Sequence, residues 1–155
     1  MLNVKYKKLN DGAIAPSAGS ACAAGYDLYA SFQEIFNPTI IAPGETMMIG
    51  TGLAVELPEG YAGLIYARSG LAVKHGLRPA NCVGVVDSDY RGEVMVALHN
   101  DSPSVQEVHN GDRIAQMIIT PYLNVTFCET DELSDTERGS GGFGRIEIIL
   151  CQKLN

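Results

Sequence analysis

Hydrophobic residues recur at every second position in several short segments of the chain. The pattern is clearest over residues 53–57, 94–98 and 123–127, where Leu, Val or Phe occupies alternate positions. Because successive side chains of a β-strand point to opposite faces, this period predicts half-buried strands. The segments are also rich in the β-branched and aromatic residues that strands favour.

Turn residues are spread evenly between these segments. The dipeptide Asn110-Gly111 separates residues 105–109 from residues 113–120, which predicts a β-hairpin. Only residues 70–76 have a pattern compatible with a helix, with room for about two turns. Many short strands at regular spacing predict an all-β fold, a jelly-roll-like β-barrel or sandwich with one short helix and a flexible C-terminal arm.

The C-terminal part of the sequence differs from the rest. Residues 129–137 include five acidic side chains, and residues 138–144 include four glycines together with Arg138 and Phe143. A glycine-rich segment loses much entropy when it is ordered, so we expect it to be mobile until a ligand binds. The arginine suits a phosphate and the ring suits a base; a tail without a function is the alternative. We therefore divide the chain into a β-barrel domain, 1–137, and a C-terminal arm with an atypical tail, 138–155.

Composition and charge narrow the function classes. The 155 residues are 46% hydrophobic and 19% charged, which is typical of one globular domain. The net charge of −7 argues against a general binder of nucleic acid or anionic membranes. Four cysteines without a CxxC pair predict neither a zinc site nor a disulfide framework. The polar N-terminal residues and the short apolar runs predict no signal peptide and no transmembrane helix. The cysteine pattern suits a reducing cytoplasm, so we expect a cytoplasmic protein.

Two segments carry candidate chemistry. Arg68, Ser69 and Gly70 precede the expected helix, where free N–H groups and the helix dipole favour an anion. The alternative is a Ser N-cap beside a surface arginine. Asp87 follows the apolar run 83–86, which would fix its carboxylate at a strand end and suit it to act as a general base. The alternative is a turn aspartate bonded to its own backbone.

Five segments in order, 24–30, 67–72, 84–93, 111–116 and 138–144, resemble the signature motifs of the homotrimeric dUTP diphosphatase (dUTPase) family. The resemblance covers most of the chain. It implies a jelly-roll homotrimer with shared active sites that hydrolyses dUTP to dUMP and diphosphate. Such an enzyme limits uracil incorporation into DNA and supplies dUMP.

The resemblance also implies roles for individual residues. Asp87 would activate the attacking water, and Tyr90 would exclude a ribose 2′-hydroxyl. The triphosphate would be held by Arg68, Ser69 and Gly70. Uracil would bind in a pocket formed by Asn81, Gly84, Val85 and Val86 and lined by Met95. Gln116 would lie near a phosphate, Asp112 and Arg113 would tie the phosphate loop, and the arm would contribute Arg138, Phe143 and Gly144 to substrate binding. Mg²⁺ would be held mainly by substrate phosphates, with Asp27 acting through water.

Several of these residues could instead have a purely structural role. Tyr90 and Met95 could be core residues, and Gln116 could be a polar residue on a strand face. The sequence departs from the family after Gly144, where Arg145 replaces a hydroxyl residue and residues 146–155 extend the tail. Two other functions fit the same fold: a dCTP deaminase, and a nucleotide-binding signalling module with weak catalysis.

Overall fold

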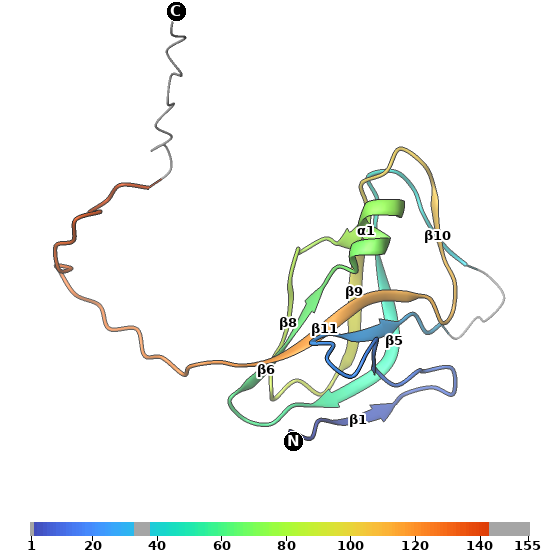
Figure 1. Cartoon of the computed structure of the whole chain (residues 1–155), viewed down its shortest axis with the longest axis horizontal. Helices are drawn as coiled ribbons and strands as arrows, with labels where there is room; N and C mark the ends of the chain where they lie inside the picture. Colours follow the sequence, from blue (N-terminus) through green and yellow to red (C-terminus); the bar gives the residue numbers. More distant parts are fainter. Residues whose placement is uncertain (1, 33–37, 143–155) are drawn as a thin grey trace, which may run out of the picture. The chain divides into compact units, whose positions relative to one another are not determined.

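The computed structural model describes residues 2–32 and 38–142 of the chain (Figure 1). These residues form eleven strands and one short helix. In chain order they are β1 Lys5–Lys8, β2 Ser17–Ala18, β3 Tyr26–Tyr29, β4 Thr39–Ile41, β5 Thr46–Glu56, β6 Tyr61–Tyr66, α1 Ser69–His75, β7 Leu77–Pro79, β8 Gly84–Val86, β9 Glu93–Asn100, β10 Gln106–Val108 and β11 Arg113–Pro121.

The strands form two larger antiparallel sheets and one small pair. One sheet has the order β1-β5-β9-β7 and the other has the order β2-β3-β11-β6-β8, while β10 pairs with β4. Leu28 and Met117 of the second sheet belong to the same buried cluster as Ile49 and Leu98 of the first. The two sheets therefore share one core, and the predicted all-β, jelly-roll-like fold is confirmed.

The alternating segments that the sequence places on strands are buried on one face. Leu53 and Val55 of β5 are buried, and so are Val94, Val96 and Leu98 of β9. Burying such apolar side chains contributes about 1.5–3 kcal/mol each. The period-two prediction is confirmed for both segments. The expected helix at 70–76 is also found, as α1, and it ends at Gly76 with φ 65°.

The predicted hairpin at Asn110-Gly111 is wrong. Strand β10 pairs with β4, whereas β11 pairs with β3 and β6, so the turn connects two different sheets. The two-residue type I′ turn of a hairpin needs positive φ at both central residues. Here Gly111 has φ 84°, but Asn110 does not share that conformation. Instead, the Asn110 side-chain oxygen accepts a hydrogen bond from the Phe32 backbone N–H.

The strand expected over residues 123–127 is also wrong. Strand β11 ends at Pro121, and no described strand pairs with the residues that follow. Leu123, Val125 and Phe127 are 87%, 65% and 94% exposed. Alternation predicts which side chains would share a face, but a strand also needs hydrogen-bonding partners along its backbone. Among the described residues, this segment has none.

The chain divides into two units, residues 1–124 and residues 125–155. The first contains all the strands and the helix described above. In the second, Arg138 donates from Nε to the Gly141 carbonyl at 2.8 Å, and the Gly141 N–H donates back to the Arg138 carbonyl. Phe143, Gly144 and Arg145 lie outside the described residues. The functional division between residues 137 and 138 stays a prediction.

The described part of the chain has no helix long and apolar enough to cross a membrane.

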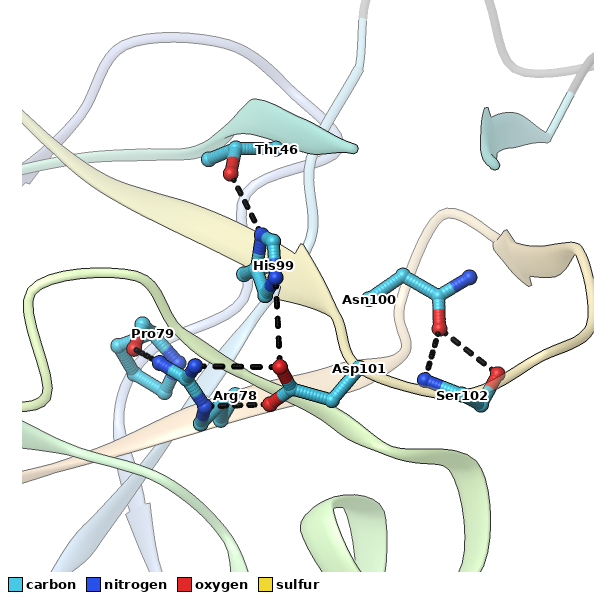
Figure 2. A network of polar contacts seen from close by, with 7 residues as sticks. All are labelled: Thr46, Arg78, Pro79, His99, Asn100, Asp101 and Ser102. Atoms are coloured by element: carbon cyan, nitrogen blue, oxygen red, sulfur yellow. Dashed lines mark hydrogen bonds and ion pairs between the residues drawn. The ribbon is translucent and has the colours of Figure 1, made fainter. Parts of the chain in front are cut away.

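A network of polar side chains joins β5, β7, β9 and the turn after β9 (Figure 2). Arg78 donates to both oxygens of Asp101, with the Nη2 contact at 3.2 Å. His99 Nε2 lies 3.3 Å from Asp101 Oδ1, and His99 Nδ1 lies 2.8 Å from the Thr46 hydroxyl. The neighbouring Asn100 is fully buried. Its Nδ2 donates to the Ile41 carbonyl and its Oδ1 accepts from the Ser102 N–H, so it fixes this turn.

We expect the Arg78→Met variant to have a lower melting temperature at pH 7, with the difference disappearing in acid. The hydrogen bond and charge of Arg78 hold the pKa of Asp101 below its usual 3.8. A carboxyl whose pKa is lowered by folding stabilises the fold above its unfolded pKa and loses that effect as the pH falls through the folded value. Melting temperatures between pH 7 and pH 2.5 check this. Lys74→Met removes an exposed cation of α1 and serves as control; a difference that stays constant in acid would contradict the account.

Candidate active site

A polar cavity of about 400 Å³ lies where three distant parts of the sequence meet. They are the loop before β3, the start of α1 and strand β11. These parts contain three of the five segments singled out in the sequence: 24–30, 67–72 and 111–116. The lining residues are Gly19, Ala23, Ala24, Gly25, Asp27, Arg68, Ser69, Gly70, Arg113, Gln116 and Ile118. A larger cavity of about 670 Å³ has mainly apolar walls and contains none of the predicted site residues.

Asp27 connects two arginines inside the polar cavity. Arg68 donates from Nε to Asp27 Oδ1 at 2.8 Å, and Arg113 donates from Nη1 to Asp27 Oδ2 at 3.4 Å. The Asp27 side chain is 14% exposed and that of Arg68 is 26% exposed, so this pair is better shielded than an ordinary surface ion pair. Since Arg68 bonds to Asp27 through Nε, its terminal nitrogens can bind an anion in the cavity.

The start of α1 forms one wall of the cavity. Arg68 is the N-cap and Ser69 is the first helical residue, so the Ser N-cap alternative is wrong. The N–H groups of Ser69 and Gly70 lie in the first turn and have no acceptor within the helix. A Cβ added to Gly70 would meet nothing within 4 Å, so the glycine leaves open space beside the cavity. These groups can together contact several oxygens of an anion.

Gln116 links the three parts that form the cavity. Its Nε2 donates to the Ala67 carbonyl at 2.9 Å, which holds the residue before Arg68. A Cβ added to Gly25 would lie 2.6 Å from Gln116 Oε1, so the loop before β3 approaches closely because residue 25 is a glycine. Gln116 is therefore more than a polar residue on a strand face. Its contact with a phosphate stays a prediction.

Strand β8 lies at the edge of the five-stranded sheet. It pairs with β6 on one side, and no other described strand pairs with its outer edge. The outer backbone groups of Gly84, Val85 and Val86 can therefore bind a ligand. Asn81 is exposed beside this strand, and its Nδ2 lies 3.5 Å from the position of a Cβ on Gly84. This arrangement suits the hydrogen-bonding edge of a planar base.

Asp87 follows β8 directly and is exposed. Its carbonyl accepts a hydrogen bond from the Tyr90 N–H at 3.2 Å, which closes a turn. Its carboxylate makes no hydrogen bond to another described residue, so the alternative of a self-bonded turn aspartate has no support. Tyr90 and Met95 are 45% and 41% exposed, so the alternative that they are core residues is wrong.

The predicted site residues of a single chain fall into two groups. Asp27, Arg68, Ser69, Gly70 and Gln116 line the polar cavity. The residues around β8 do not line it; they are Asn81, Gly84, Val85, Val86, Asp87, Tyr90 and Met95. Arg138 belongs to the second unit, and Phe143 and Gly144 lie outside the described residues.

Arg113 is linked to Arg68 through a shared carboxylate. Both arginines pair with Asp27, while Asp112 accepts a hydrogen bond from the His109 N–H within its own turn. That Asp112 and Arg113 tie the phosphate loop stays a prediction. Arg113 and Asp27 are 86 positions apart, and the β3–β11 pairing brings them together. Local sequence carries no signal for this contact; correct pairing of the two strands would have found it.

The fold and the two groups of predicted site residues define a class of protein. It is an all-β protein with a cavity lined by arginines that suits phosphate, and with a strand edge at β8 that suits a base. A profile of the dUTPase family matches residues 11–146. The chain belongs to the dUTPase family.

Relatives named deoxyuridine 5′-triphosphate nucleotidohydrolase are similar along nearly their whole length. The protein from Nautilia profundicola is 48% identical over 92% of this chain and 97% of that relative. The protein from Treponema denticola is 46% identical over 92% of this chain and 97% of that relative.

Solved structures of phage dUTPases share the fold. The dUTPase of Staphylococcus bacteriophage 80alpha, solved with dUPNHPP, has a TM-score of 0.82 at 27% identity and covers 92% of this chain and 96% of that chain. A mutant dUTPase from phage phi11 of S. aureus, described with a structural Mg(II) ion, has a TM-score of 0.76 at 23% identity. The match covers 86% of this chain and 99% of that chain. The second likeness supports the fold only.

Proposed function

We propose that this chain hydrolyses dUTP to dUMP and diphosphate. The observation that carries the proposal is the polar cavity in which Asp27 orients Arg68 beside the open first turn of α1. Three segments typical of the dUTPase family meet there. The cavity supplies a guanidinium group and backbone N–H groups, which are the donors that a triphosphate requires.

Uracil and deoxyribose bind at the edge strand β8 in this proposal. The backbone groups of Gly84, Val85 and Val86, with Asn81, read the base edge, and Met95 lines the pocket. Cytosine would present a donor where uracil has an acceptor, and an unpaired buried group costs about 1–3 kcal/mol. Tyr90 lies against the sugar, where its ring excludes a 2′-hydroxyl.

Asp87 is the general base of the proposed reaction. Its exposed carboxylate accepts a proton from water as the water oxygen bonds to the α-phosphorus. The bond from the α-phosphorus to the bridging oxygen breaks, and diphosphate leaves in line with the attacking oxygen. Arg68 and Arg138 bind the phosphate charge, and Phe143 stacks on the base. The reaction limits uracil incorporation into DNA and supplies dUMP.

The donor set fits Mg²⁺ that is held mainly by substrate phosphates. The described residues contain no group of three or more His, Cys, Asp or Glu side chains that could bind a metal by themselves. Both oxygens of Asp27 accept from arginines, but a carboxylate has about four acceptor sites, so Asp27 can also bind water on the ion. When bound, the ion would offset the phosphate charge.

A homotrimer with shared active sites is part of the proposal. Its support is that the residues around β8 do not line the polar cavity of the same chain. A second copy could bring the two groups together, and the arm, residues 138–155, could come from a third. We further propose a cytoplasmic enzyme without nucleic-acid or membrane partners, in agreement with its net charge of −7.

We expect purified protein with Mg²⁺ to cleave dUTP about 10²-fold or more faster than UTP, measured as kcat/KM from diphosphate release. The physical reason is the steric block by Tyr90. Release of dUTP from dCTP would indicate a deaminase instead, and nucleotide binding without turnover would indicate a signalling module. Equal cleavage of dUTP and UTP would contradict the role of Tyr90.

A further inference from the structure

The ring of Tyr90 is fixed inside a short braced segment, residues 87–93. The Tyr90 hydroxyl donates to the Glu93 carbonyl at 2.9 Å, so the side chain folds back along its own backbone. Arg91 donates from Nη1 to the carbonyls of Ser88 and Tyr90 at 2.6 and 2.9 Å. These contacts hold the turn and the ring in one arrangement, although Tyr90 as a residue is 45% exposed.

Gly92 lies directly beneath this ring. A Cβ added to Gly92 would lie 2.6 Å from Tyr90 Cζ and 3.0 Å from Cε2, and it would be closer still to the hydroxyl oxygen. Distances this short cannot persist, because carbon atoms in contact are about 3.5–4.0 Å apart. Any side chain at position 92 must therefore displace the Tyr90 ring or move the backbone of the turn.

The other end of the segment is anchored in the sheet. Glu93 begins β9, and its Oε1 accepts a hydrogen bond from the Gly52 N–H of β5 at 2.7 Å. The β5–β9 register shifts between Gly50 and Ala54, and a Cβ added to Gly50 would lie 2.6 Å from Glu93 Oε1. Strands β5 and β9 lie side by side in Figure 1. Because Glu93 is held by this hydrogen bond and by the β5–β9 pairing, we expect a clash at Gly92 to be relieved more readily by the exposed Tyr90 side chain than by the sheet.

We propose that Gly92 is a positioning residue that sets the selectivity of the site for deoxyribose over ribose, by letting the Tyr90 ring lie flat on the backbone. The proposal rests on the proposed function, since it presumes that Tyr90 contacts the sugar. Deoxyribose and ribose differ by one hydroxyl, so a ring shift of about an ångström is enough to change whether a 2′-hydroxyl fits. Adding or removing one small group in a pocket typically changes selectivity about 10–200-fold.

The test is a double-mutant cycle on the ratio of kcat/KM for dUTP to kcat/KM for UTP. The variants are Gly92→Ala, Tyr90→Ala and the two combined. Gly12→Ala is the control, because Gly12 is exposed and its added Cβ would come no closer than 3.4 Å to a neighbour. We expect Gly92→Ala to lower the ratio at least about tenfold. In the Tyr90→Ala background, the same change should leave the ratio as it is, because the displaced group is gone.

Melting temperatures of the same variants test the contact without any assumption about the substrate. Gly92→Ala should destabilise the chain more in the presence of Tyr90 than in the Tyr90→Ala background. If Gly92→Ala alone fails to fold, the double variant should still fold. An unchanged ratio in Gly92→Ala, a further fall in the double variant, or equal destabilisation in both backgrounds would each overturn the proposal. If the unchanged protein does not prefer dUTP, the proposed function fails before any variant is compared, and the melting data still report on the contact.

Discussion

Asp87→Asn should bind nucleotide about as well as the unchanged protein and lose most turnover. An amide has nearly the shape of a carboxylate but cannot accept the proton of the attacking water, and loss of a general base commonly costs about 10²–10⁴-fold in rate. Asp87 follows β8 and is exposed, so the substitution leaves the core intact. Turnover is measured with saturating dUTP, and binding with a non-hydrolysable dUTP analogue.

Asp89→Asn is the matched control for this experiment. Asp89 is an exposed carboxylate two positions further along the same turn, so its substitution removes the same charge from the same part of the surface. It should retain most of the activity. Near-normal turnover in Asp87→Asn, or equal losses in the two variants, would remove Asp87 from the role of base.

Truncation after Glu137 should leave a folded protein that has lost most dUTP hydrolysis. All the strands and the helix that the structure describes lie before residue 122, so the truncation keeps every one of them. The truncation removes Arg138 and Phe143, whose expected contributions are charge-assisted hydrogen bonds to phosphate and stacking on uracil worth about 1–3 kcal/mol. A loss of about 10²-fold or more in kcat/KM is expected when both are removed.

Truncation after Gly144 separates the arm from the atypical tail. This variant keeps Arg138 and Phe143 but lacks Arg145 and residues 146–155, so it should lose much less activity. Circular dichroism and sedimentation of all three proteins check that fold and assembly are unchanged. Equal activity in the full chain and both truncations would show that the arm takes no part in catalysis.

The parts of the fold that depend on local patterns could be predicted from the sequence. Alternation at Leu53 and Val55, and again at Val94 and Val96, marks residues that the structure buries. The predicted helix, residues 70–76, agrees with α1 within one residue at each end, and Gly76 ends the helix as a left-handed C-cap.

Features that depend on distant contacts could not be predicted in this way. The alternation over residues 123–127 looks like that of β5, yet a strand forms only where a partner backbone is present, and the described residues provide none. Asn110-Gly111 has the composition of a hairpin turn, but its observed backbone directs β11 to the other sheet. The Asp27–Arg113 pair depends on the pairing of two strands far apart in sequence.

Hydrolysis in ¹⁸O-labelled water tests the central claim most directly. The full chain is incubated with Mg²⁺ and an equimolar mixture of dUTP, UTP and dCTP. The products and their ¹⁸O content are identified by mass spectrometry. Attack of an Asp87-activated water on the α-phosphorus predicts dUMP as the main nucleotide product, with the label in dUMP and none in diphosphate. Label in the diphosphate, UMP formed as fast as dUMP, or conversion of dCTP to dUTP would contradict the account.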